Sequence, residues 1–285
     1  MEFSQQLTID GKVFDFVDVQ RDGSTAIYKN VSAYLRVGDV LKIQKDLARH
    51  KQMEGCGFPV AKLLAEGTIA GMAYFIEESL GDRHYGIIFK EETEEFGAIR
   101  DQTFDQFVDF CVRFAQAQLK TVTGEQDWPG FEKGIHLDIL CQEMPAEKEK
   151  ILSKYRAVQK KLAGVPFMLS HGDMTTFNIL PKGIIDFEDS FMGPAGYDLG
   201  ALVEHLNWFP ESTDYEYYRL YDFTPAQRQR FLDRIDDVYS KVKLPKLSDH
   251  LAEFNFTRGI WFAVRMGHAP KLGKFRHDEI RKLIS

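Results

Sequence analysis

Short apolar runs alternate with tight turn signals through the first 90 residues of the chain. The runs are rich in Val, Ile, Phe and Tyr, and the dipeptides Asp-Gly, Gly-Asp and Ala-Gly between them favour antiparallel hairpins. We therefore expect a small antiparallel sheet built from "KVFDFVDV", "TAIYKN", "AYLRV", "VLKI" and "MAYFIEE". One helix is predicted to interrupt this sheet at about 44–54, where "GCGFP" supplies Gly and Pro stop signals.

Beyond residue 100 the apolar residues recur at intervals of three and four, the spacing of amphipathic helices. The segments with this spacing are "FDQFVDFCVRFAQAQL", "AEKEKILSKYRAVQKKLA", "TPAQRQRFLDRIDDVYSKV" and "DHLAEFNFTRGIWFAVRMG". The acidic stretch "KEETEEF" at 90–96 is expected to be a solvated connector. The pattern predicts an α+β chain, with a small sheet followed by a larger, mainly helical part.

Composition and charge narrow the class of protein. Hydrophobic residues make up 44% of the 285 residues, enough for a buried core. A formal net charge of -7 and a pI of about 5.7 argue against nucleic acid as a partner. The chain shows no secretory leader pattern and no run of about 18 apolar residues, so we expect no membrane association and a cytoplasmic location. Cys56, Cys111 and Cys141 are widely spaced and odd in number, which favours reduced, buried thiols.

Residues 168–200 concentrate the candidate chemistry in "MLSHGDMTTFNILPKGIIDFEDSFMGPAGYDLG". Within it, "NILPKGIID" has the pattern of two short strands joined at a turn, which would bring Asn178 and Asp186 to the same end of a hairpin. Amide and carboxylate oxygens are ligands that Mg²⁺ prefers, and one or two from the protein suffice. Asp173 precedes Asn178 at the spacing of a kinase catalytic loop. A pair of ordinary loop residues in Asx turns is the alternative.

The motifs "HGDMTTFN", "IIDFED" and "GPAGYDLG", in this order, resemble those of the aminoglycoside phosphotransferase and choline kinase-like family of small-molecule kinases. The resemblance implies a two-lobed protein kinase-like fold. It places a nucleotide-binding lobe with the antiparallel sheet at 1–80, a hinge at about 76–81, and a helical catalytic and substrate lobe at 81–285. The loop departs from the family pattern, because "TTF" stands where members often carry a second His and a Pro.

The resemblance also gives roles to individual residues. It implies that Asp173 is the catalytic base, that Asn178 and Asp186 ligate Mg²⁺, and that Asp198 is a buried carboxylate bracing the catalytic loop. His171 would then be structural. Asp198 also suits the first turn of a helix, where an acid complements the helix dipole, and both roles can hold at once.

The upstream half is similar to the family's ATP lobe only loosely. Either "DGST", with Ser24, or "NVSA" would cover the phosphates, although neither is rich in glycine. Lys42 in "VLKI" is the expected phosphate-binding lysine, Arg36 in "YLRV" is the alternative, and the following helix offers no obvious Glu to pair with either. The segment "YFIEESLG" resembles the hinge, where the backbone of Glu77 and Ser79 would bind the adenine edge.

Residues 207–223 carry seven aromatic residues among several acids and are the expected acceptor pocket. Aromatic faces and carboxylates attract cations, so an amine or quaternary ammonium alcohol is the natural candidate. A loop simply packed onto the core is the alternative. Glu188 and Asp189 receive no role.

We therefore expect an ATP-dependent kinase that phosphorylates a hydroxyl of a small molecule, with ATP and Mg²⁺ as cofactors. A nucleotide-binding pseudokinase or regulatory module of the same fold is the alternative, because the glycine loop is weak and the helix Glu is missing. A protein kinase is disfavoured, since no A-P-E segment occurs and only a short interval separates Asp186 from "GPAGYD".

Overall fold

The computed structural model describes residues 3–20, 23–187 and 189–285. The chain forms two compact units: Met1–Asp82 with Leu180–Glu188, and Arg83–Ile179 with Asp189–Ser285. Strands dominate the first unit and helices the second, so the predicted α+β organisation is confirmed.

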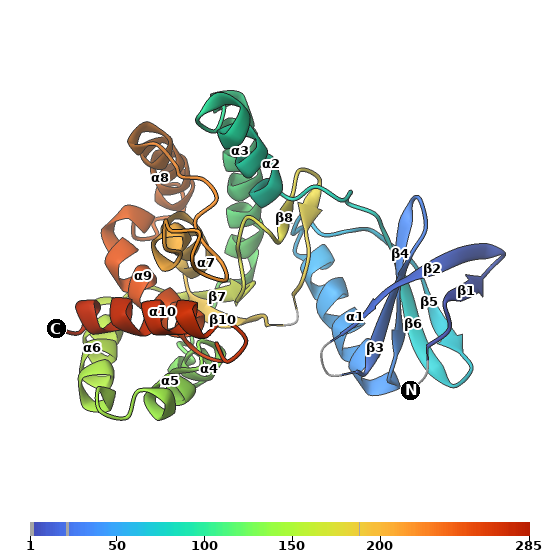
Figure 1. Cartoon of the computed structure of the whole chain (residues 1–285), viewed down its shortest axis with the longest axis horizontal. Coiled ribbons are helices and arrows are strands. Elements are labelled where there is room, and N and C mark those ends of the chain that lie inside the picture. Colours follow the sequence, from blue (N-terminus) through green and yellow to red (C-terminus); the bar gives the residue numbers. More distant parts are fainter. Residues whose placement is uncertain (1–2, 21–22, 188) are drawn as a thin grey trace. The chain divides into compact units, whose positions relative to one another are not determined.

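The first unit is built on a six-stranded antiparallel sheet with the strand order β1-β2-β3-β4-β6-β5 (Figure 1). The strands are β1 (Gln6–Ile9), β2 (Lys12–Val19), β3 (Thr25–Lys29), β4 (Ala33–Gly38), β5 (Leu63–Ile69) and β6 (Met72–Glu78). The predicted strands that became β2, β3, β4 and β6 are confirmed, whereas the apolar pattern does not predict β1 and β5. Alternate residues of β3 and β4, among them Tyr28 and Leu35, form the buried face of the sheet.

Helix α1 (Val40–Gly55) begins earlier than expected, and the strand prediction for "VLKI" is wrong. The side chain of Asp39 accepts the N–H of Lys42 at 3.0 Å and so caps the helix. Ile43 and Met53 are buried, and the helix contacts β4 and β6. The cap and the helical spacing of these apolar residues outweigh the β-branched composition of the short run.

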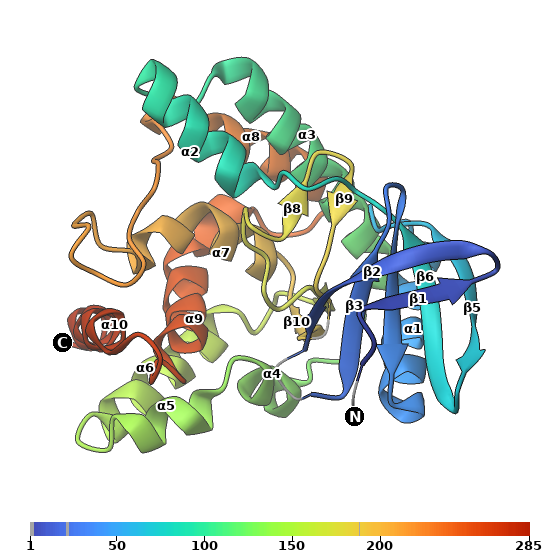
Figure 2. The same ribbon diagram turned by 45° about the vertical axis from the view of Figure 1, so that its right-hand side comes forward.

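The second unit is mainly helical (Figure 2). Its helices are α2 (Tyr85–Phe96), α3 (Asp101–Gln118), α4 (Trp128–Gly134), α5 (Leu137–Glu143), α6 (Lys148–Lys161), α7 (Tyr197–Glu204), α8 (Pro225–Ser240), α9 (Leu251–Ala263) and α10 (Pro270–Leu283). The four predicted helices are confirmed as α3, α6, α8 and α9. Helix α9 contacts both α7 and α10 and is buried over most of its length. Within the described part of the chain, no helix is long and apolar enough to cross a membrane.

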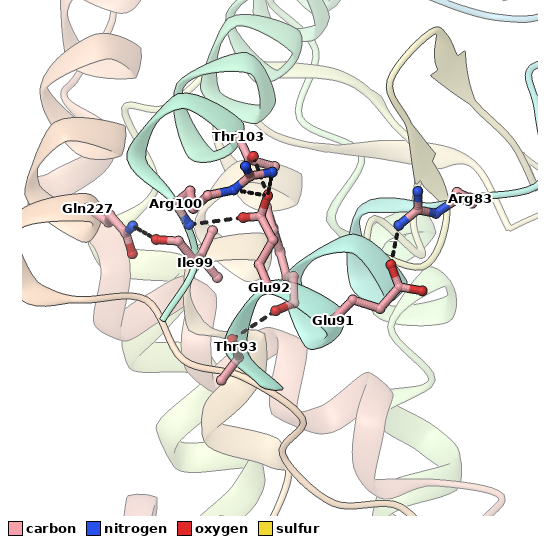
Figure 3. A network of polar contacts seen from close by, with 9 residues as sticks. Arg83, Glu91, Glu92, Thr93, Ile99, Arg100, Thr103 and Gln227 are labelled. Carbon is pink, nitrogen blue, oxygen red and sulfur yellow. Dashed lines mark hydrogen bonds and ion pairs between the residues drawn. The ribbon is translucent and has the colours of Figure 1, made fainter. Parts of the chain in front are cut away.

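The acidic stretch 90–96 is not a solvated connector, and that prediction is wrong, because the stretch forms the second half of α2. Glu92 is buried and accepts hydrogen bonds from Arg100 N at 2.9 Å and Thr103 Oγ1 at 2.6 Å, at the start of α3 (Figure 3). A carboxylate at this position accepts hydrogen bonds from donors near the N-terminus of α3 and complements the dipole of that helix. It thereby ties α2 to α3.

Two short two-stranded sheets are formed by residues of 167–194. Strand β7 (Phe167–Ser170) pairs with β10 (Phe191–Pro194), and β8 (Ile179–Leu180) pairs with β9 (Gly183–Ile184). The hairpin predicted for "NILPKGIID" is therefore confirmed. The three cysteines are free thiols as predicted, with Cys111 and Cys141 buried and Cys56 half-buried.

Candidate active site

The loop 171–178 starts directly after β7, whose four residues are all buried. Gly172 has a φ of 85°, and a Cβ atom at this position would lie 2.1 Å from the backbone oxygen of Asp189. Glycine is therefore required here, both for its positive φ and for the close approach of the neighbouring backbone. The turn presents Asp173 at a fixed position just outside the buried strand.

Asp198, in the first turn of α7, holds the backbone of this loop. Its Oδ2 atom accepts the N–H of His171 at 2.8 Å, and its Oδ1 atom accepts the N–H of Gly172 at 3.2 Å. Gln118 Nε2 donates to the same Oδ2 at 2.7 Å. Burial raises the pKa of Asp198, and the hydrogen bonds from the loop oppose that shift. These contacts are those expected of a carboxylate that braces the loop.

Arg258, from α9, contacts the predicted catalytic base. Its Nη2 donates to Asp173 Oδ1 at 2.7 Å, and its Nη1 donates to Gly172 O at 2.8 Å. Burial alone would lower the pKa of Arg258, but the charge of Asp173 outweighs it and the pKa lies above its usual value. The guanidinium also lies over the rings of Trp261 and Phe262, at 4.2 and 4.3 Å from their centroids. Asp173 therefore sits beside a permanent, fully buried positive charge.

Sequence reasoning missed Arg258, although one signal could have found it. The residue stands in "FNFTRGIWFAV", where it is the sole ionisable residue in an apolar stretch of a helix predicted to be in the core. A buried Arg needs a partner, because an unpaired charge in a low-dielectric core is costly. The pattern alone cannot name that partner.

Asn178, at the end of the loop 171–178, is hydrogen-bonded back to Asp173. Its Nδ2 donates to Asp173 O at 2.8 Å and to Asp173 Oδ2 at 3.2 Å. Both bonds use the amide nitrogen, so the amide oxygen is the atom of this side chain suited to a metal ion. Asp173 and Asn178 are thus brought together in the second unit, and 23% of the Asp173 side chain is exposed.

A second polar cluster lies in the first unit, around Arg36 on β4. Arg36 Nε lies 3.1 Å from Glu77 Oε1 on β6, and His50 Nδ1 lies 3.5 Å from Glu77 Oε2. Burial lowers the pKa of Arg36, but the charges of Glu77, Asp186 and Asp46 more than compensate and raise it. The guanidinium therefore sits on a central strand among carboxylates of β6, α1 and the segment after β9.

Asp186, the second predicted metal ligand, belongs to the first unit, whereas Asn178 belongs to the second. Its backbone has a φ of 70°, a conformation uncommon outside glycine but several-fold enriched in Asp and Asn. Such strain is often found where a side chain must point to a functional site. Among the described residues, no group of three or more His, Cys, Asp or Glu side chains could hold a metal ion by itself.

The structure shows which neighbours surround three of the predicted nucleotide-binding residues, Lys42, Ser24 and Ser79. Lys42 lies on the first turn of α1 instead of on a strand, and its Nζ is 3.7 Å from Asp46 Oδ1. Ser24 lies between β2 and β3, and its backbone oxygen accepts the N–H of Asp39 at 3.0 Å. The N–H of Ser79 donates to Ser32 O at 2.9 Å, so an adenine contact there would have to use the Ser79 carbonyl.

The two candidate phosphate loops differ in structure. "NVSA" forms a tight turn between β3 and β4, in which Asn30 Oδ1 accepts the N–H groups of Ser32 and Ala33 at 3.0 and 2.9 Å. "DGST" joins β2 to β3, and its Gly23 has a φ of 72°. Asp22 of this segment lies outside the described residues, as does Glu188.

An aromatic cavity of about 350 Å³ lies beside the loop 171–178. It is lined by Phe177, His205, Leu206, Phe209, Glu216, Tyr217, Tyr218, Arg219, Leu220 and Tyr221. Phe177 belongs to the loop itself, and the hydroxyl of Tyr221 is hydrogen-bonded to that of Thr176 in the same loop. A larger cavity, of about 550 Å³, is lined by residues of α4, α5 and α6 and includes none of the predicted site residues.

Comparisons with known proteins bear on the family and the fold of the chain. A family model described as the phosphotransferase enzyme family matches residues 31–232. No curated protein sequence matches the chain. A choline/ethanolamine kinase family protein from Mesorhizobium loti has a similar structure, with a TM-score of 0.60 and 12% identity over 95% of this chain and 88% of that one.

Two aminoglycoside phosphotransferases are similar in structure as well. A thermostable mutant of APH(4)-Ia, in a ternary complex with AMP-PNP and hygromycin B, gives a TM-score of 0.55 and 13% identity over 96% of this chain and 95% of that one. APH(3'')-Id from Streptomyces rimosus, in complex with ADP and streptomycin, gives a TM-score of 0.55 and 11% identity over 86% of this chain and 92% of that one. At these identities the likeness concerns the fold, and the predicted kinase-like fold is confirmed.

Proposed function

The chain belongs to the phosphotransferase enzyme family, and from this premise we propose that it transfers the γ-phosphate of ATP to a hydroxyl group of a small molecule. The observation that carries the proposal is the surroundings of Asp173. Arg258 Nη2 fixes one carboxylate oxygen at 2.7 Å, Asn178 bonds the other at 3.2 Å, and the side chain remains partly exposed. A carboxylate held in this way is preorganised to accept a proton.

Asp173 acts in this proposal as the general base. It accepts the proton of the acceptor hydroxyl while that oxygen attacks the γ-phosphorus and the bond to the β,γ-bridging oxygen breaks. The products are a phosphate monoester and ADP. Asp198 and Arg258 position the loop and the carboxylate without contacting the reacting atoms.

Asn178 and Asp186 are the residues proposed to hold Mg²⁺. One amide oxygen and one carboxylate fit this hard cation, which usually takes few protein ligands and completes its shell with phosphate oxygens and water. When bound, Mg²⁺ neutralises charge on the transferring phosphate.

Arg36 replaces Lys42 in our proposal as the cation that meets the ATP phosphates. It lies on β4, the strand that precedes α1, and Glu77 holds its Nε at 3.1 Å. An Arg can bond phosphate oxygens in a bidentate manner while it keeps a carboxylate partner. Glu77 on β6 then supplies the ion pair that the sequence of α1 did not offer.

ATP turnover against a panel of alcohols tests the function. We expect ADP release above the basal hydrolysis rate with at least one member of the panel, and a phosphate monoester detectable by ³¹P NMR. A nucleotide-binding pseudokinase of the same fold would bind ATP yet release ADP with none of them, and no Asp173 variant would change its behaviour.

A further inference from the structure

The side chains that line the aromatic cavity beside the catalytic loop limit which acceptor molecules can bind there. Six of its lining residues carry rings: Phe177, His205, Phe209, Tyr217, Tyr218 and Tyr221. Its volume of about 350 Å³ is near the lower end of the roughly 300–1,000 Å³ typical of ligand pockets. A compact molecule with an apolar surface fits such a cavity better than a large polyhydroxylated one.

His205 brings no charge to this cavity. Its Nδ1 donates to Leu202 O, so its Nε2 is left to accept the hydroxyl of Tyr221 at 3.2 Å. Burial lowers the pKa of His205 to about 4. The Tyr221 hydroxyl is in turn bonded to Thr176. These polar groups therefore satisfy one another and leave a ring surface towards a ligand.

Glu216 is the carboxylate among the ten lining residues, and both of its oxygens already accept hydrogen bonds. Glu216 accepts the N–H groups of Lys271 and Leu272 through its two oxygens, each at 3.1 Å. These donors belong to the first turn of α10, so Glu216 serves as a cap of that helix. A cationic ligand would find no uncommitted carboxylate among these ten residues.

Positively charged guanidinium groups, by contrast, lie close to the aromatic residues of the cavity. The guanidinium of Arg276 is 4.9 Å from the ring centroid of Phe209, which lines the cavity. Arg276 donates to the carbonyl oxygens of Trp208 and Phe262, and no described carboxylate is bonded to it. Arg219 adds a further guanidinium to the lining, which is paired with Asp222 at 3.2 Å and with Glu211 at 3.6 Å. A second cation brought to the Phe209 ring would meet like charge in a poorly screened place.

We propose that the acceptor is a compact, uncharged alcohol with an apolar or aromatic body, and that the cavity discriminates against quaternary ammonium alcohols and amino sugars. The inference rests on the proposed phosphotransfer, because it takes this cavity as the acceptor site. It replaces the amine or quaternary ammonium alcohol expected from the aromatic residues and acids of 207–223.

Two alcohols that differ only in charge test the proposal directly. Choline and neohexyl alcohol have nearly the same shape, because a tert-butyl group replaces the trimethylammonium group. Binding to the full chain is measured by ligand-observed NMR titration without nucleotide, with kanamycin as the amino-sugar probe. We expect neohexyl alcohol to bind at least roughly tenfold more tightly than choline, the equivalent of about 1.4 kcal/mol, and kanamycin to leave its binding unchanged.

Leu220, which lines the cavity, offers a matched pair of variants. Leu220→Glu introduces an uncommitted carboxylate and should lower the preference for neohexyl alcohol at least fivefold, whereas Leu220→Gln, of the same size, should keep it. Equal or tighter binding of choline by the native chain would overturn the proposal, and so would a failure of both alcohols to bind at millimolar concentration.

A separate measurement distinguishes this proposal from the proposed function. ADP release is followed with each alcohol at saturating ATP. A retained binding preference without any phosphorylated alcohol would count against phosphotransfer and leave the cavity's selectivity in place. Phosphorylation of choline but not of neohexyl alcohol would uphold phosphotransfer and overturn the acceptor class.

Discussion

The guanidinium of Arg258 donates to Asp173 Oδ1 at 2.7 Å, although 85 positions separate the two residues in the chain. Arg258 is fully buried, whereas 23% of the Asp173 side chain is exposed. The pair thus anchors one carboxylate oxygen in the core of the helical unit and leaves part of the carboxylate accessible. This is a suitable arrangement for a base that must keep its direction while a substrate approaches.

Asp173→Asn should lower turnover by roughly a hundred- to ten-thousand-fold, because an amide cannot accept the hydroxyl proton. ATP affinity, measured by calorimetry, should stay within about twofold. The exposed Asp249→Asn is the matched control and should keep full activity. A turnover rate within threefold of the native one would remove Asp173 from the role of base.

Arg258→Lys keeps the charge but cannot reach Gly172 O and Asp173 Oδ1 together in a planar fork. We expect kcat to fall by about ten- to a hundredfold with little change in the KM for ATP, since the base is misdirected while nucleotide contacts are intact. Arg258→Ala should lose more activity and melt at a lower temperature. The exposed Arg156→Lys on α6 is the control. Equal losses in kcat and ATP affinity would indicate general unfolding instead.

Arg36→Ala should raise the KM for ATP far more than Lys42→Ala, by about tenfold or more, because a charged phosphate contact is worth about 1.5–3 kcal/mol. Arg36→Lys, which retains a cation beside Glu77, should recover part of the loss. Initial-rate measurements over a range of ATP concentrations give both parameters. A larger rise in the KM for ATP in Lys42→Ala than in Arg36→Ala would mean that Lys42, in the N-terminal turn of α1, contacts the phosphates instead.

Mg²⁺ and ATP should bind together, because the two proposed protein ligands are too few to hold the ion without phosphate oxygens. Calorimetry of ATP binding should therefore show a clear gain in affinity with Mg²⁺ in the native chain. The gain should shrink in Asn178→Ala and in Asp186→Ala, and should persist in the exposed control Asp138→Ala. The same ATP affinity with and without Mg²⁺ in the native chain would rule out a shared site.

The stability of the chain should fall as pH drops from 6.5 to 4, in part through His205. Burial and the nearby charges of Arg258 and Arg219 lower its pKa to about 4 in the folded chain, from an ordinary value of 6.5. The unfolded chain therefore binds the proton first. The stability linked to this group is complete above pH 6.5 and lost by about pH 4, a change of about 3 kcal/mol.

Urea unfolding of the native chain and His205→Gln at several pH values measures this contribution. The variant should be less stable at pH 7, because it loses the bond to Tyr221, but its free energy of unfolding should fall less steeply between pH 6.5 and 4. Parallel curves for the two proteins would mean that His205 is not the group that titrates.

Patterns within a few residues determined much of this protein from the sequence alone. Alternation of apolar residues predicted β3 and β4, and spacing of three and four predicted α3 and α9. The interval from Asp173 to Asn178 is equally local, since Asn178 Nδ2 bonds the backbone oxygen five positions away. Such features depend on backbone periodicity and short loops, which the order of residues specifies directly.

Only the tertiary structure decided which distant residues became partners. Glu92 looked like part of a solvated acidic run, yet the start of α3 packs against it and buries it. The segment "VLKI" was expected to be a strand, yet the side chain of Asp39 caps it as the first turn of α1. Arg258 reaches Asp173 because α9 packs next to α7, whose Asp198 holds the backbone of the loop 171–178. Contacts of this range arise from how whole elements bury their apolar faces, and no local spacing in the sequence records that packing.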